Sequence, residues 1–109
     1  MNFTKHAIVI GDYFDGNLRK KKESGYAFMN ENDSFYTVKI HMNPINNYFL
    51  VKNKKNDLYT VFSKIDRSNN QVNFKNPVGY AKLLENNKSY MQIKFFMPKM
   101  TMFMDLYAS

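Results

Sequence analysis

Few side chains in this sequence are suited to catalysis. The chain has no cysteine, and His6 and His41 are its only histidines. No serine lies in a Gly-x-Ser-x-Gly turn or a similar nucleophile setting. The aspartates lie mostly in turn-like segments, where Asp stabilises the turn through its own backbone hydrogen bonds. We therefore predict no paired-carboxylate site and a protein that is not an enzyme.

Methionine thioethers are the remaining candidates for metal ligands. Met97, Met100, Met102 and Met104 crowd near the C-terminus, and thioethers are soft ligands that suit Cu(I). No other kind of soft ligand stands nearby, and alternating methionines also fill gaps in a core. The run from Gly11 to Asn17 has oxygen ligands but lacks the spacing of an EF-hand. We predict no metal and no cofactor.

Aromatic residues alternate with lysines on two predicted strands, opposite the apolar residues. Bases of single-stranded nucleic acid stack on exposed rings for about 1–3 kcal/mol each, while lysines neutralise the backbone. Two lysine-rich segments would extend this basic surface. The predicted nucleic-acid-binding residues are Phe35, Lys39, Tyr90, Lys94, Phe96, Arg19, Lys20, Lys21, Lys22, Lys52, Lys54 and Lys55.

The charge balance fits a polyanionic partner. Sixteen Lys and Arg against nine Asp and Glu give a formal net charge of +7 and a pI near 9.6. An AT-rich coding sequence would explain part of the lysine excess. Arg19 and Arg67 are the only arginines, so bidentate reading of guanine is barely available. We expect binding with little sequence specificity and a preference for single strands, and DNA and RNA both stay open.

A protein-interaction module is the alternative function. In this interpretation the chain is an inhibitor or an accessory subunit that docks an acidic partner. Docking would use a strand edge or the Met-rich C-terminal region, with Met97, Met100 and Met102 as the contact residues. The sequence also leaves a homodimer open.

Short β-like runs separated by Asn- and Asp-rich turns dominate the chain. After Asn76-Pro77, residues 78–85 fit a strand or a short helix, and the hairpin signal at Asn86-Asn87 favours the strand. The fold class is therefore all-β, a barrel or two-sheet sandwich of about seven to nine short antiparallel strands, with an OB-like barrel among the options and at most one short helix at 78–85. The expected strands are 5–10, 26–29, 34–42, 48–52, 57–65, 71–75, 78–85, 90–96 and 102–107.

The chain length of 109 residues predicts a single β-rich domain over 1–109. Residues 15–25 are polar and basic with almost no apolar period, so a mobile basic loop is expected there. We see no internal repeat. The longest apolar runs are too short to span a bilayer, and no signal sequence is recognised, so a cytoplasmic location is expected. The composition suggests the product of a mobile element.

Overall fold

The chain folds into eight β-strands in the computed structural model, which describes residues 3–30, 34–68, 71–97 and 99–107. No helix occurs among these residues, and so none is present in them that could cross a membrane. The strands are β1 (Phe3–Phe14), β2 (Asn17–Asn30), β3 (Tyr36–Ile40), β4 (Asn47–Lys52), β5 (Tyr59–Ser68), β6 (Gln71–Leu83), β7 (Tyr90–Phe96) and β8 (Lys99–Asp105).

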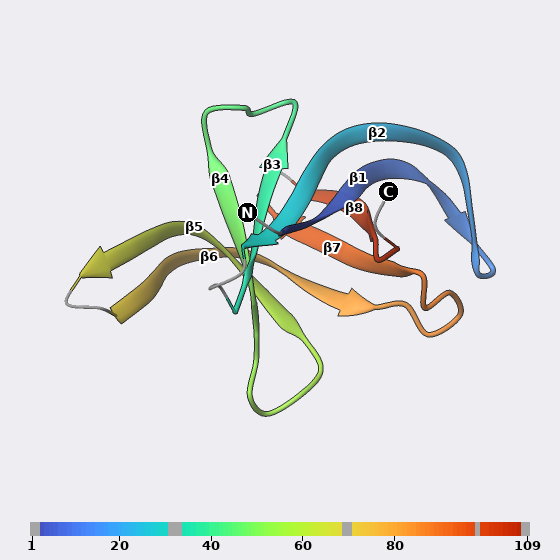
Figure 1. The fold of residues 1–109 in the computed structure, drawn as a ribbon. Coiled ribbons are helices and arrows are strands. Elements are labelled where there is room, and N and C mark those ends of the chain that lie inside the picture. Colours follow the sequence, from blue (N-terminus) through green and yellow to red (C-terminus); the bar gives the residue numbers. More distant parts are fainter. Residues whose placement is uncertain (1–2, 31–33, 69–70, 98, 108–109) are drawn as a thin grey trace.

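The eight strands form a closed barrel in which every strand pairs antiparallel with its neighbours in the sequence (Figure 1). β1 and β8 close the ring through two residue pairs, Ile8 with Met104 and Val9 with Phe103. The all-β prediction is confirmed, and residues 78–83 are strand, as the sequence favoured. The barrel is an eight-stranded meander, so the OB-like option, a five-stranded Greek-key barrel, does not describe it.

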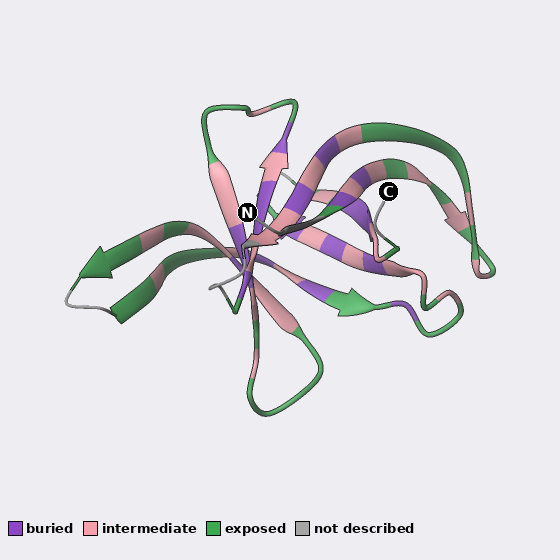
Figure 2. Cartoon of the chain, in the orientation of Figure 1, coloured by how far each residue is buried: buried purple, intermediate pink, exposed green. Residues whose placement is uncertain are grey.

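Side chains alternate between the barrel interior and its outer wall, as the period of two along a strand requires. The predicted inward row of β3, with Val38 and Ile40, is buried, while Lys39 points to the outer wall. Buried residues concentrate along the middle of the strands, and exposed residues along the loops and hairpin ends (Figure 2). The core is formed by Ile8, Ala27, Val38, Ile40, Leu50, Val61, Ala81, Met91, Ile93, Phe95, Met102 and Met104.

Two long hairpins extend beyond the barrel on opposite sides, and we call them the β1–β2 arm (residues 9–24) and the β5–β6 arm (residues 62–68 and 71–77) (Figure 1). The expected loop at 15–25 is therefore wrong, because Lys22 and Arg19 pair with Ile10 and Asp12 of β1. An exposed hairpin needs no apolar period, since its backbone pairs across a tight turn. That turn has positive φ at Asp15 (52°) and Gly16 (81°), the pattern of a type I′ hairpin.

The barrel consists of two equivalent halves, β1–β4 and β5–β8, which corrects the expectation of no internal repeat. The tripeptide Gly25-Tyr26-Ala27 of β2 recurs as Gly79-Tyr80-Ala81 of β6. Tyr26 pairs with Lys39 of β3 as Tyr80 pairs with Lys94 of β7. The two halves therefore place this tripeptide and its partner lysine at the same points of the sheet.

The equivalence extends to the strands on either side of the tripeptide. Ile8 pairs with Gly25 and Val61 pairs with Gly79, and each pairing is followed by a bulge on the way into an arm. Leu50 of β4 pairs with Val61, just as Met104 of β8 pairs with Ile8. Each half thus joins the next in the same register, which gives the ring an approximate two-fold symmetry.

Each arm packs on the outer wall of the half to which it does not belong. In the β1–β2 arm the Tyr13 ring lies 5.7 Å from that of Phe103, and Gly16 accepts a hydrogen bond of 3.1 Å from the side-chain amide of Asn87. In the β5–β6 arm the Phe74 ring lies 5.0 Å from that of Phe35 and 6.2 Å from that of Phe49. The two arms therefore interlock the halves.

One glycine at the base of each arm allows two paired strands to approach closely. A Cβ at Gly25 would overlap the carbonyl oxygen of Lys39, and a Cβ at Gly79 would overlap that of Lys94. Both glycines are buried, so a displaced neighbour has no free space to occupy. Only glycine fits at these two positions.

Replacing either glycine by alanine should destabilise the barrel. We expect Gly25→Ala and Gly79→Ala each to lower the free energy of unfolding by about 2–3 kcal/mol, because the added methyl forces the paired strands apart. Urea unfolding measures the change, and Thr101→Ala on the exposed wall should stay within about 0.5 kcal/mol of the wild type. Unchanged midpoints for both glycine variants would contradict the close approach.

Candidate nucleic-acid interface

Two aromatic rings and two lysines surround a hollow on the outer wall of β6, β7 and β8. The hollow has a volume of about 480 Å³, and its lining includes Tyr80, Lys94, Phe96 and Lys99. The ring centroids of Tyr80 and Phe96 lie 6.2 Å apart, with the planes inclined by 40°. Tyr80 pairs with Lys94 and Phe96 pairs with Lys99, so the sheet register places a lysine opposite each aromatic residue.

The charged residues in the described lining of this hollow, Lys94 and Lys99, are both cations. Lys82 follows Tyr80 in the outward row of β6, beside Gln92, and it also lines a separate hollow together with Asp57 and Glu85. Residues 71–84 and 90–104 contain no Asp or Glu, and Asp105, the last residue of β8, pairs with Tyr90 at the opposite end of the β7–β8 pairing from Phe96 and Lys99. We call Tyr80, Lys82, Lys94, Phe96 and Lys99 the Tyr80 face. It combines apolar rings with three cations and presents no carboxylate of its own.

The equivalent wall of the other half carries a similar cluster. The Lys5 ammonium lies 4.5 Å from the centroid of the Tyr26 ring, and the Tyr26 and Phe28 rings are nearly parallel, 6.1 Å apart. Lys39 pairs with Tyr26 across the strands. We call Lys5, Tyr26, Phe28 and Lys39 the Tyr26 face. It lies across the barrel from the Tyr80 face, because β2 and β6 are four strands apart in either direction around the ring.

The basic segment of the β1–β2 arm lies beside β7. The Lys21 ammonium donates a hydrogen bond of 3.2 Å to the Tyr90 hydroxyl and lies 5.9 Å from the Tyr90 ring centroid. Tyr90 therefore packs under the arm, while Lys94 and Phe96 of the same outward row line the hollow. The remaining basic residues of the arm are exposed, and they are Arg19, Lys20 and Lys22.

Phe35 is the exception among the predicted aromatic contacts. Its side chain is only 4% exposed, because Phe49 and Phe74 pack against it and the Arg67 guanidinium lies 5.6 Å from its ring centroid. The outward direction of Phe35 agrees with the predicted alternation. Its expected exposure is wrong, since the β5–β6 arm covers this part of the wall and leaves no ring surface for a base.

The other predicted residues are dispersed. Lys52 lines a mouth of the barrel, and Lys54 and Lys55 are exposed in the turn between β4 and β5. Met97 is 90% exposed, whereas Met102 is 3% exposed and belongs to the core. Met100 is half-buried between them. The three methionines proposed for a protein partner therefore do not form one surface.

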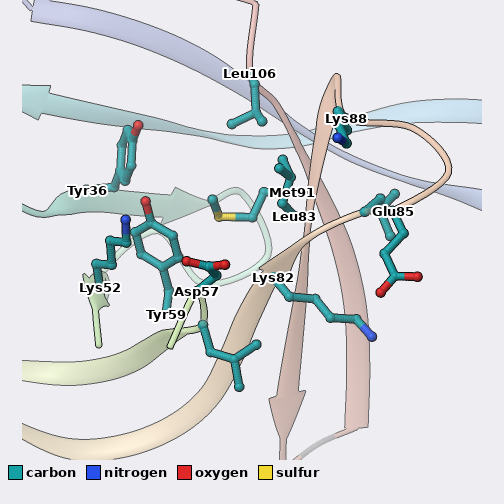
Figure 3. A pocket seen from close by; sticks show the side chains of 12 residues that line it. Tyr36, Lys52, Asp57, Tyr59, Lys82, Leu83, Glu85, Lys88, Met91 and Leu106 are labelled. Carbon is teal, nitrogen blue, oxygen red and sulfur yellow. The ribbon is translucent and has the colours of Figure 1, made fainter. Parts of the chain in front are cut away.

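The mouth next to the start of β3 holds a second hollow, of about 580 Å³ (Figure 3). Met91 and Leu106 contribute apolar lining, and the rim carries the hydroxyls of Tyr36 and Tyr59 together with Lys52. Burial raises the pKa of Tyr36 above its ordinary value, and the neighbouring Tyr59 adds to the shift. At neutral pH the Tyr36 hydroxyl is therefore a hydrogen-bond donor and not a base.

The two histidines lie in different environments. His6 is buried and its Nδ1 donates a hydrogen bond of 2.8 Å to the carbonyl oxygen of Asp105, so its position is structural. His41 is exposed at the end of β3. Within the part of the chain that the structure describes, no three His, Asp or Glu side chains gather into a group that could hold a metal ion.

Sequence reasoning missed six members of the two faces, which are Lys5, Tyr26, Phe28, Tyr80, Lys82 and Lys99. The repeated Gly-Tyr-Ala tripeptide was the available signal, because each copy places a tyrosine outward beside a glycine. Comparison with known protein families, with curated proteins and with solved structures finds no match. Any function must therefore be argued from the chemistry of the site itself.

The raised pKa of Tyr36 makes stability depend on pH in the alkaline range. The folded state holds this proton more tightly than the unfolded state, so the Tyr36 contribution is complete below the unfolded pKa of about 10 and is lost as pH rises through the folded pKa. Urea unfolding from about pH 8 to 11 should show a shallower alkaline decline for Tyr36→Phe than for the wild type. The exposed Tyr107→Phe is the control. Identical slopes for all three proteins would contradict the assignment.

Proposed function

We propose that the protein binds single-stranded nucleic acid, without catalysis, through the Tyr80 face. The observation that carries the proposal is the contact of two rings, Tyr80 and Phe96, in a hollow whose described lining contains Lys94 and Lys99 and no carboxylate. Rings stack with bases, and ammonium groups neutralise phosphates, so the two kinds of side chain meet the two parts of a nucleotide.

The exposed rings favour a single strand over a duplex. Phe96 is 57% exposed, so one face of its ring is available to an unpaired base. Bases inside a duplex are already stacked on each other and do not reach such a ring without unpairing. Lysines contact the backbone as point charges, and the face contains no arginine for bidentate base reading. Little sequence specificity follows from this chemistry.

Binding of an acidic protein partner is the other candidate function, and fewer observations support it. The closed ring of paired strands leaves no full-length strand edge among the described residues, which removes the usual support for strand addition. The Met-rich segment is split between the core, at Met102, and the surface, at Met97. The Tyr80 face is the more coherent surface.

Removing the three lysines of the face should weaken binding and its dependence on salt. Each neutralised phosphate contributes about 0.7 to the slope of log K against log salt for a single strand, so Lys82→Gln/Lys94→Gln/Lys99→Gln should flatten this slope by about 2. Fluorescence anisotropy of a labelled oligothymidylate at several salt concentrations measures it.

The matched control removes three lysines elsewhere, as Lys54→Gln/Lys55→Gln/Lys64→Gln. Both triple variants have the same net charge, so generic attraction predicts the same loss for both. A slope that falls equally in the two proteins would contradict a localised face, and a wild type that binds no oligonucleotide at low salt would end the proposal.

Removing the stacking rings should weaken binding at every salt concentration. We expect Tyr80→Ala and Phe96→Ala each to lower the affinity for the same oligonucleotide about tenfold, with the salt slope unchanged, because stacking releases no counterions. Phe14→Ala is the control, since Phe14 is 80% exposed at the far end of the β1–β2 arm. Equal losses for Phe14→Ala and Phe96→Ala would show that the position of the ring does not matter.

A further inference from the structure

The two-fold repeat gives the chain a second binding site, and we propose that a single nucleic-acid strand contacts the Tyr80 face and the Tyr26 face together. This inference rests on the proposed function and adds the extent and the route of the bound strand. Tyr26 and Lys39 occupy the sheet positions that Tyr80 and Lys94 occupy in the other half. A site that binds a nucleotide in one half therefore has a counterpart in the other.

The Tyr26 face has the same chemistry as its counterpart. Its rings, Tyr26 and Phe28, lie nearly parallel, and Lys5 and Lys39 stand beside Tyr26. No Asp or Glu occurs in residues 3–11, 24–30 or 34–42, which supply β1, β2 and β3 around it. Paired rings and neighbouring lysines again match the base and the phosphate of a single strand.

A hollow at the base of the β1–β2 arm links the two faces. It has a volume of about 430 Å³, and Met100 and Thr101 line both this hollow and the hollow of the Tyr80 face. On its other side it is lined by Ser24 and His41, which lie two residues from Tyr26 and Lys39 along β2 and β3. A strand that leaves the Tyr80 face over Thr101 therefore reaches the Tyr26 face without crossing the arm.

The lining of this hollow suits the bases more than the phosphates. Ile10, Ile40, Met42 and Met102 contribute apolar side chains to it. Glu23 contributes a carboxylate, which repels the phosphates of a strand on this route. Lysines and rings at the two faces would therefore hold the ends of the bound strand. The Glu23 carboxylate would repel its middle, and a substitution can remove that charge.

The length of the oligonucleotide distinguishes one bridging strand from two independent sites. Titration calorimetry with oligothymidylates of about 5 and about 15 nucleotides spans the sizes that small single-strand-binding domains occupy. We expect two short oligonucleotides per chain, and one long oligonucleotide bound at least tenfold more tightly, because the second contact becomes intramolecular.

Matched substitutions test each face. Tyr26→Ala/Lys39→Gln and Tyr80→Ala/Lys94→Gln should each leave one short oligonucleotide per chain and abolish the gain in affinity with length. The control Phe14→Ala/Lys54→Gln removes the same kinds of side chain from exposed positions away from both faces and should retain the gain. Thermal unfolding confirms that each variant is folded. Glu23→Gln should tighten the long oligonucleotide about threefold and leave the short one unchanged.

The outcomes separate the two claims. One short oligonucleotide per chain, with Tyr26→Ala/Lys39→Gln indistinguishable from the wild type, would overturn the second site and leave the proposed function intact. Two long oligonucleotides per chain would overturn the bridging strand in favour of separate strands on the two faces. Failure of both lengths to bind at low salt would overturn the proposed function and this inference with it.

Discussion

The close approach of two strands at a glycine, made twice around the ring, is the constraint on which the remaining structure depends. At Gly25 and Gly79 the neighbouring carbonyl oxygen occupies the space of a side chain. Beside each glycine the register shifts by a bulge, and bulges bend and twist a strand. The barrel can therefore curve closed while its two longest hairpins leave it. The same backbone positions turn Tyr26 and Tyr80 outward next to a lysine.

Closure of the ring divides the side chains of the strands into an inward set, which faces the barrel interior, and an outward set, which faces the outer wall. The inward set fills the interior with aliphatic and methionine side chains, so the outward set is not needed for the main core. The arms then cover part of the outer wall, where they bury Phe35 against Phe74 and pack Tyr13 on Phe103. The parts of the wall that the arms do not cover include the two lysine and tyrosine faces. The core residues and the proposed binding residues are thus alternate residues of the same strands.

The sequence predicted what depends on local pattern. The alternation in β3 and β7 located the strands and the outward direction of Lys39, Lys94 and Phe96. The arms were missed because an exposed hairpin carries no apolar period, and the burial of Phe35 depends on one of these arms. The repeat was missed because the halves share few identical residues. Whether an outward ring is covered or free is decided by segments distant in the sequence, which a single strand pattern does not reveal.

The interlocked arms arrange the two halves as two subunits of a two-fold dimer would be arranged, with each half covering the wall of the other. In a symmetric dimer every substitution occurs at both equivalent positions. In a continuous chain each position changes alone, and the two faces already differ, with Phe28 where the other half has Lys82 and His41 where it has Phe96. Because both halves belong to one chain, the two faces can differ in their affinity for the proposed nucleic-acid strand. The strand would then bind in one preferred direction, which an assembly of identical halves cannot impose.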